Sequence, residues 1–288
     1  MPTGSRILGT VRLLTFLLMV LLVGGIQAII LAVPSLRRAH EHRIPLMFHK
    51  LACKVFGIEI ELHGKPVETK PLLFVSNHTS YLDIPVLGSL IPGSFVAKAE
   101  VASWPLFGTL ARLQRTVFIE RNRRDLDNQR RNMADRVTDG TDLILFPEGT
   151  SSDSLGVLPF KSALFSVADL AAGNGEGDTQ LTIQPIAVLC THLDNLPLGR
   201  DMRHVYAWYG DMDLMPHLWR LACLGHCTVT VAFLKPIKVA GASRKDMAKQ
   251  AEDAVRGAID QINGGLPLDG LAGVPERTPD PSPEALAA

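Results

Sequence analysis

The sequence predicts an α/β fold with a mostly parallel central sheet flanked by helices. Short apolar runs of strand length recur along the chain, and segments long enough to form helices separate them. Alternation of this kind is typical of a central sheet covered by helices. A chain of 288 residues with 47% hydrophobic residues can also bury one substantial core. We therefore expect one domain of the size usual for an enzyme.

An uncharged stretch, LLTFLLMVLLVGGIQAIILAV at residues 13–33, lies near the start of the chain. As a helix rising about 1.5 Å per residue, it is long enough to cross a hydrocarbon layer of roughly 30 Å. A cleaved signal peptide is the rival interpretation, but its apolar core usually holds about 7 to 15 residues and a clear cleavage site follows it. We expect a retained N-terminal membrane helix.

The segment after this helix carries more Lys and Arg than the segment before it, so the positive-inside rule places the following domain in the cytoplasm. Residues 40–56 mix basic and apolar side chains. Such a helix can lie in the membrane interface or face the core of the domain, and the sequence supports both interpretations equally. We expect residues 1–57 to form membrane-anchoring helices, 58–264 the catalytic domain and 265–288 a Pro-rich disordered tail.

The elements of the domain follow from local periodicity. Residues 58–62 alternate Ile and Glu, the pattern of a half-buried strand, and later apolar runs repeat the signal. The expected strands are residues 58–62, 72–75, 95–97, 117–119, 143–146, 186–189 and 229–233. The expected helices are a charged one at 125–137, an apolar one at 160–171 and an amphipathic one at 243–262.

Charge and cysteine content limit the partners. The 29 basic residues offset the 29 acidic ones, so no overall field favours nucleic acid. The four cysteines show no paired framework, which indicates a reducing compartment. Cys223, His226 and Cys227 resemble part of a zinc site, but a structural zinc needs four ligands and no second cluster follows. We expect neither nucleic acid nor metal as a partner.

The stretch VSNHTSYLDIP at residues 75–85 places His78 and Asp83 directly behind an apolar strand. A histidine takes a proton near neutral pH, and a carboxylate on its far ring nitrogen strengthens it as a base. Five residues is the wrong interval for one helix face, so the pair requires a turn. The alternative is a plain helix cap, with Asp83 at the N-terminus or with Ser80 in a capping box. This stretch alone leaves both interpretations open.

Two further stretches place polar residues at strand ends. LILFPEGTSSD at residues 143–153 runs from a strand into a loop in which Gly149 lets backbone approach a ligand, and Thr150 and Ser151 offer hydroxyl and amide donors. RTVFIER at residues 115–121 ends on Arg121, a side chain suited to phosphate or carboxylate. Strand ends of one sheet can converge on one cleft. Each stretch by itself is equally typical of a turn or a solvated surface.

Taken in order, NHTSYLD, RTVFIER, FPEGTSS and TIQPIAV resemble the four motif blocks of the glycerolipid acyltransferase family that includes lysophosphatidate acyltransferases. The resemblance covers roughly residues 58–240. It implies that His78 is the general base and Asp83 its orienting partner, with Pro185 of the fourth block as structural support. The residues that it implies for substrate binding are Asn77, Lys98, Arg121, Glu148, Gly149, Thr150 and Ser151, although Lys98 also fits an ordinary surface lysine.

The resemblance implies direct transfer of an acyl group from an acyl thioester, acyl-CoA or acyl-ACP, to the hydroxyl of a membrane lysolipid at the cytoplasmic face of a bacterial inner membrane. The thioester is a co-substrate, and no separate cofactor is expected. No covalent acyl-enzyme is expected either, because no G-x-S-x-G elbow surrounds Ser80.

The motifs depart from the lysophosphatidate pattern at one position that bears on the acceptor. Many lysophosphatidate enzymes carry Arg where this chain has Ser151. FPEGTSSD together with AWYGDMDLMPHLW, residues 207–219, looks more like the branch containing bacterial lyso-ornithine lipid acyltransferases. Asp211 and Asp213 are candidates to meet an ornithine amine. A thioester or lipid hydrolase that uses the same His–Asp pair, and an inactive membrane scaffold, are the rival functions.

Overall fold

The computed structural model describes residues 4–69, 72–119, 140–166, 182–237 and 241–273. Arg121, the predicted helix 125–137 and residues 274–288 of the predicted tail lie outside the described residues. The first part of that tail, residues 265–273, is not disordered, because Leu271 forms a bridge with Leu234 and the Ala272 N–H donates to the Phe233 carbonyl. The predicted helix 160–171 is described only in its first part, where η3 (Ser162–Phe165) forms a 3-10 turn.

The described strands form one eight-stranded sheet in the order β1-β8-β6-β2-β5-β3-β4, with the short β7 paired to β6. Most neighbouring strands run parallel; β8 and β7 run antiparallel to β6. The predicted α/β class and mostly parallel sheet are confirmed. The bounds are β1 (Ile58–His63), β2 (Leu72–Ser76), β3 (Ser94–Lys98), β4 (Val117–Ile119), β5 (Leu143–Leu145), β6 (Thr182–Leu193), β7 (Leu196–Pro197) and β8 (Cys227–Phe233).

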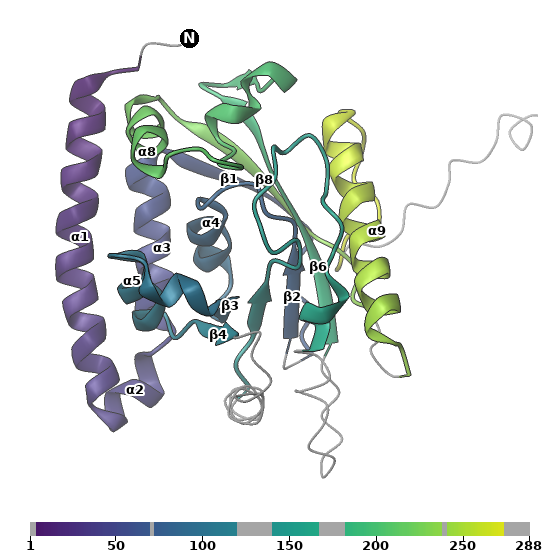
Figure 1. Ribbon diagram of the computed structural model, residues 1–288, viewed down its shortest axis with the longest axis horizontal. Coiled ribbons are helices and arrows are strands. Elements are labelled where there is room, and N and C mark those ends of the chain that lie inside the picture. Colours follow the sequence, from purple (N-terminus) through teal and green to yellow (C-terminus); the bar gives the residue numbers. More distant parts are fainter. Residues whose placement is uncertain (1–3, 70–71, 120–139, 167–181, 238–240, 274–288) are drawn as a thin grey trace, which may run out of the picture.

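Helices cover both faces of the sheet (Figure 1). On one face α9 (Arg244–Asn263) packs against β6, and its N-terminus is closed by a capping box between Ser243 and Asp246. On the other face lie α3 (Arg43–Phe56), α4 (Asp83–Leu90) and α8 (Leu214–Cys223). The remaining helices are α1 (Arg6–Ala32), α2 (Pro34–His40) and α5 (Phe107–Leu113).

The segment 40–56 is largely α3, which buries one face against the core. His49, Cys53 and Phe56 lie on that buried face, whereas Met47 and Leu51 stay exposed. The helix ends at Gly57, whose φ of 67° is left-handed. A side chain at this position would clash with the carbonyl oxygen of Gly225. The core-facing interpretation therefore describes one side of α3, and its exposed apolar residues remain available to an interface.

The apolar helix α1 is about 40 Å long and meets the length and hydropathy expected of a membrane-crossing helix. It runs alongside the domain (Figure 1), and side chains near both of its ends are bonded to the domain. Near its start, Arg12 donates to the carbonyls of Ala222, Leu224 and Gly225 at the end of α8. Near its end, Gln27 donates to the carbonyl of Leu113 in α5. Its outward face is apolar and exposed and includes Ile7, Val11, Leu14, Leu18, Leu21, Leu22 and Ile29.

The carboxyl ends of β2, β5 and β3 meet at one edge of the sheet, because these neighbouring strands are parallel. In register, Val75 pairs with Leu145, and Val96 pairs with Leu145 from the other side. The NHTSYLD turn, the FPEG turn and Lys98 follow these three strand ends. The fold thus brings together segments that are far apart in sequence, as expected for a site at the carboxyl edge of a parallel sheet.

Candidate active site

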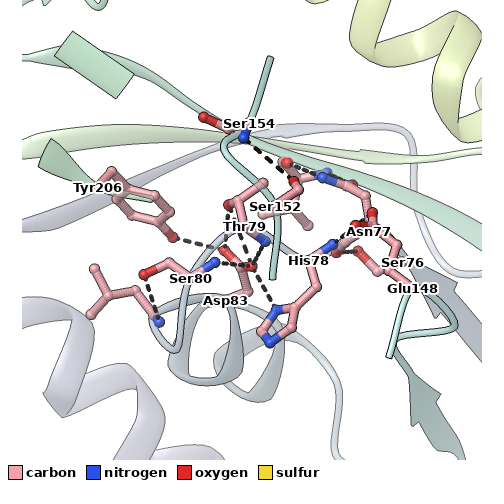
Figure 2. A network of polar contacts seen from close by, with 12 residues as sticks. Ser76, Asn77, His78, Thr79, Ser80, Asp83, Glu148, Ser152, Ser154 and Tyr206 are labelled. Carbon is pink, nitrogen blue, oxygen red and sulfur yellow. Dashed lines mark hydrogen bonds and ion pairs between the residues drawn. The ribbon is translucent and has the colours of Figure 1, made fainter. Parts of the chain in front are cut away.

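His78 and Asp83 form a hydrogen-bonded pair at this edge (Figure 2). His78 lies just past the end of β2, and Asp83 is the first residue of α4, so the chain reverses between them. The His78 Nδ1 atom lies 3.0 Å from Asp83 Oδ2. Since an ionised carboxylate can only accept, Nδ1 carries the proton and Nε2 keeps its lone pair. Nε2 points away from Asp83, and the His78 side chain remains 19% exposed.

The Asp83 carboxylate is fully buried and satisfied by several donors. Its Oδ2 accepts the backbone N–H groups of Thr79 at 2.7 Å and Ser80 at 2.9 Å in addition to the His78 ring. It therefore holds the turn and orients the imidazole, but it does not cap α4, because Leu82 is the N-cap residue and no side chain caps the helix; the interpretation of Asp83 as N-cap is wrong. The predicted capping box is only half formed, because the Ser80 hydroxyl accepts from the Leu82 N–H instead of the Asp83 N–H.

A third residue, which the sequence did not predict, is bonded to this pair. The Tyr206 hydroxyl, 123 residues further along the chain, donates to Asp83 Oδ1 at 3.1 Å. Tyr206 is only 2% exposed, and burial raises the pKa of its hydroxyl well above the usual value, which keeps it a donor. Its position follows from the segment after η4 (Arg200–Val205), whose Trp208 N–H donates to the Thr79 carbonyl. A tyrosine in the YAWYG stretch carried no local signal for this contact.

The backbone of His78 is held from both sides by the FPEG loop. The His78 N–H donates to Glu148 Oε1 at 3.2 Å, and the His78 carbonyl accepts the Ser152 N–H at 2.9 Å. The Phe146 ring also stacks on the imidazole with a centroid separation of 4.1 Å. The two stretches predicted to converge are thus in direct contact, and the FPEG loop sets the position of the imidazole.

Asn77 and Glu148 are both buried. The Asn77 side chain donates to the Val188 carbonyl at 2.8 Å and accepts the Val188 N–H at 2.9 Å, which ties the turn to β6. Glu148 is 1% exposed and holds the His78 backbone. The substrate-binding roles that the resemblance implies for these two residues remain predictions, whereas their contacts support the turn.

The pKa of Glu148 is raised from 4.5 to about 8, mainly by burial and to a lesser degree by the charge of Asp83, against the lowering effects of the bond from the His78 N–H and the charge of Arg256. Among the described residues, Glu148 Oε2 is buried without a hydrogen-bond partner, which a neutral carboxyl tolerates better than a carboxylate. The folded chain therefore keeps a proton at Glu148 that the unfolded chain loses near its ordinary value of 4.5.

This proton makes stability fall as pH rises from about 4.5 to about 8, because the unfolded state binds fewer protons throughout that window. The slope is at most about 1.4 kcal/mol per pH unit. We expect the thermal midpoint in detergent to drop between pH 5.5 and pH 8, and to drop less in Glu148→Gln, which is neutral at every pH. An equal drop in both proteins would contradict a protonated Glu148.

The remaining predicted site residues lie at the surface of the same edge. Gly149 closes the turn by donating its N–H to the Phe146 carbonyl at 3.1 Å, and its φ of 66° favours glycine. Thr150 follows it and is exposed, Ser151 is partly buried, and Lys98 is exposed at the end of β3. The hydroxyl groups of Thr150 and Ser151 and the ammonium of Lys98 thus follow the strand ends that lead to the His78 turn.

The segment 207–219 lies against the turn between His78 and Asp83, as the Trp208 to Thr79 bond shows. The Tyr81 hydroxyl also contacts His217 Nδ1 at 3.0 Å, and the rings of Tyr81 and Trp208 pack edge to face. Asp211 and Asp213 belong to this segment.

An open groove of about 500 Å³ lies elsewhere, along β1, β6 and β8, and His78 is not among its lining residues.

An α/β sheet whose carboxyl edge presents an imidazole with one nitrogen held by a buried carboxylate defines an enzyme able to use general-base chemistry. The family model described as Acyltransferase matches residues 59–189. The chain belongs to the acyltransferase family and is an enzyme that transfers acyl groups. The predicted family is thereby confirmed.

Relatives with known names cover most of the chain. A lyso-ornithine lipid O-acyltransferase from Brucella abortus is 42% identical over 227 residues, covering 78% of this chain and 85% of the relative. Another from Rhizobium meliloti is 35% identical over 254 residues, covering 85% and 87%. A 1-acyl-sn-glycerol-3-phosphate acyltransferase from Neisseria gonorrhoeae is 32% identical over 213 residues, covering 73% and 77%.

A solved structure shares the fold. The 1-acyl-sn-glycerophosphate acyltransferase PlsC from Thermotoga maritima superposes with a TM-score of 0.59 at 20% sequence identity, covering 89% of this chain and 96% of the other. At this identity the likeness supports the fold only. It extends over most of the chain, so the architecture is shared well beyond the residues matched by the family model.

Proposed function

We propose that this enzyme transfers a fatty acyl group from an acyl thioester to the free hydroxyl of a lysolipid, with lyso-ornithine lipid as the acceptor. The observation that carries the proposal is the His78 ring, whose Nδ1 is bonded to buried Asp83 while Nε2 points away from it. The choice of acceptor is supported by the identity of 42% to the Brucella abortus lyso-ornithine lipid O-acyltransferase.

In the proposed mechanism, His78 Nε2 removes the proton from the acceptor hydroxyl as its oxygen attacks the thioester carbonyl carbon. Asp83 stabilises the resulting imidazolium through Nδ1. The tetrahedral oxyanion then collapses, the C–S bond breaks, and the thiolate takes the proton back from the imidazolium. The donors of exposed Thr150 and partly buried Ser151 are candidates to stabilise the oxyanion, because they follow the turn that holds His78.

Lysophosphatidate is the second candidate acceptor, favoured by the identity of 32% to the Neisseria gonorrhoeae enzyme. The donor is the thioester of coenzyme A or of acyl carrier protein. Both acceptors present a hydroxyl at a membrane surface, so the same base can serve either one.

In this proposal α1 lies along the cytoplasmic face of the inner membrane, with the domain beside it. Two observations support this arrangement. The bonds of Arg12 and Gln27 hold both ends of the helix against the domain, and its opposite face is apolar and exposed. A helix crossing the bilayer with these bonds intact would carry α8 or α5 into the hydrocarbon, whereas a helix lying in one leaflet keeps both at the surface.

The test uses purified full-length protein in detergent with a labelled acyl thioester and either lyso-ornithine lipid or lysophosphatidate. We expect labelled ornithine lipid as the main product. Thioester loss is measured in parallel without any lysolipid, because transfer needs the acceptor and hydrolysis does not. Equal thioester loss with and without acceptor would replace the transferase by a hydrolase.

Tyr206 is expected to tune this base through Asp83. In Tyr206→Phe the carboxylate loses a donor and holds the protonated imidazole more strongly, so we expect the acid limb of the kcat/KM profile to move to higher pH. The expected fall in kcat is about tenfold, the lower end of the range for one lost hydrogen bond to a charged group. Tyr209→Phe, three residues away in the same segment, is the matched control. A Tyr206→Phe enzyme with the wild-type pH profile would remove Tyr206 from the mechanism.

A further inference from the structure

Lys161 places a cation directly on the FPEG turn. Its side chain lies across Gly149: a Cβ built on Gly149 would meet Lys161 Nζ at 2.9 Å and Cδ at 3.4 Å. The glycine is therefore needed for two reasons, its left-handed φ of 66° and the space that the lysine chain occupies. No sequence motif singled out Lys161, because it follows the FPEG turn by more than ten residues.

The backbone around Lys161 is fixed by bonds on both sides. The Lys161 N–H donates to the Pro147 carbonyl at 2.9 Å, and the Lys161 carbonyl accepts the Leu164 N–H at 2.9 Å. The preceding residue, Phe160, is buried and donates its N–H to Glu252 Oε2 on α9 at 2.9 Å. Lys161 is thus attached to the turn whose Phe146 ring stacks on His78. The fold therefore sets the position of the Lys161 backbone, from which the side chain extends.

The ammonium of Lys161 has no carboxylate partner within the part of the chain that the structure describes. The side chain is exposed, yet it lies over a turn instead of extending into solvent. The neighbouring Glu148 carboxyl is neutral in the folded protein up to about pH 8 and does not neutralise the cation. The turn that holds Gly149 and that stacks Phe146 on the imidazole consequently also carries the positive charge of Lys161.

We propose that Lys161 binds the anionic group of the acceptor head, the carboxylate of lyso-ornithine lipid or the phosphate of lysophosphatidate, and so sets which lysolipid hydroxyl reaches His78. This inference rests on the proposed function and names the residue that selects its acceptor. A cation attached to the turn whose Phe146 ring stacks on His78 suits an acceptor whose anionic group and reactive hydroxyl belong to one molecule.

The test measures KM and kcat of full-length enzyme for lyso-ornithine lipid, its methyl ester and lysophosphatidate. Lys161→Met keeps the length of the side chain and removes its charge. We expect it to raise KM for the acid about 10- to 100-fold, the range for a lost hydrogen bond to a charged group, and to leave KM for the methyl ester unchanged. Lys161→Arg should restore most of the difference. Lys245→Met, on the exposed side of α9, is the matched control.

Several outcomes would overturn the inference. One is that Lys161→Met changes KM for the acid and the ester alike, or changes only KM for the thioester. Another is that Lys98→Met abolishes the discrimination and Lys161→Met does not. The lysophosphatidate arm shows which anion is bound, since the preferred acceptor must show the larger loss in Lys161→Met.

A wild-type enzyme that acylates none of the three lipids would overturn the proposed function and not, by itself, the role of Lys161. Binding without donor separates the two. The acid must bind wild-type protein more tightly than its methyl ester, and Lys161→Met must bind both equally. Equal binding of acid and ester by wild-type protein would overturn the inference whatever the activity.

Discussion

His78→Ala is expected to lower kcat for acyl transfer by about 10²- to 10⁴-fold, the usual contribution of a positioned general base. The fold should persist, because the imidazole makes one bond to Asp83 and one stack on Phe146, while the turn is held by backbone bonds to Glu148 and Ser152. The measurement is transfer of a labelled acyl group to lysolipid, together with the thermal midpoint in detergent.

His63→Ala is the matched control for this substitution. His63 is a partly exposed histidine next to Glu61 at the end of edge strand β1, on the far side of β8 and β6 from the candidate base. It should keep wild-type activity. A His78→Ala enzyme that retains more than a tenth of wild-type activity would remove His78 as the general base and would favour a role in binding.

Asp83→Asn is expected to lower kcat about 100-fold or more, because a neutral amide no longer stabilises the imidazolium that forms during transfer. Stability should fall by only about 1–2 kcal/mol. The amide oxygen can still accept from Thr79 N–H, Ser80 N–H and the His78 ring. The hydroxyl of Tyr206 can turn to accept from the new NH₂ group.

The double variant His78→Ala with Asp83→Asn tests whether the carboxylate acts through the imidazole. In that case Asp83→Asn costs little further activity once His78 is absent, although it still lowers stability. Activity losses that multiply would show that Asp83 contributes to catalysis independently of His78.

The parts of the fold set by local pattern could be predicted. Alternation at residues 58–62 and short apolar runs located most strands within a residue or two, and the helix predicted at 243–262 is α9 (Arg244–Asn263). Strand β6 is longer than its predicted core of 186–189, because its outer half pairs with β8 and the short hairpin strand β7. Pairing partners of this kind come from the whole chain, so a short window cannot reveal them.

The candidate site was predictable only where its residues are neighbours in sequence. His78 and Asp83 share one turn, and the strand-end rule predicted the approach of the FPEG loop. Tyr206 and Lys161 reach the site through long-range packing. Glu148 shows the opposite problem: a charged residue in a polar loop resembles a ligand for a head group, yet here it is buried against the His78 backbone.

The attachment of α1 bears on how this protein can be produced. Deleting the first helix to obtain a soluble enzyme would leave the last carbonyls of α8 without the donors of Arg12 and would strip Phe56 of its ring contact with Phe16. The shortened protein would expose core side chains where the native one is sealed. Detergent or lipid nanodiscs with the intact chain are therefore the proper starting material for every assay above.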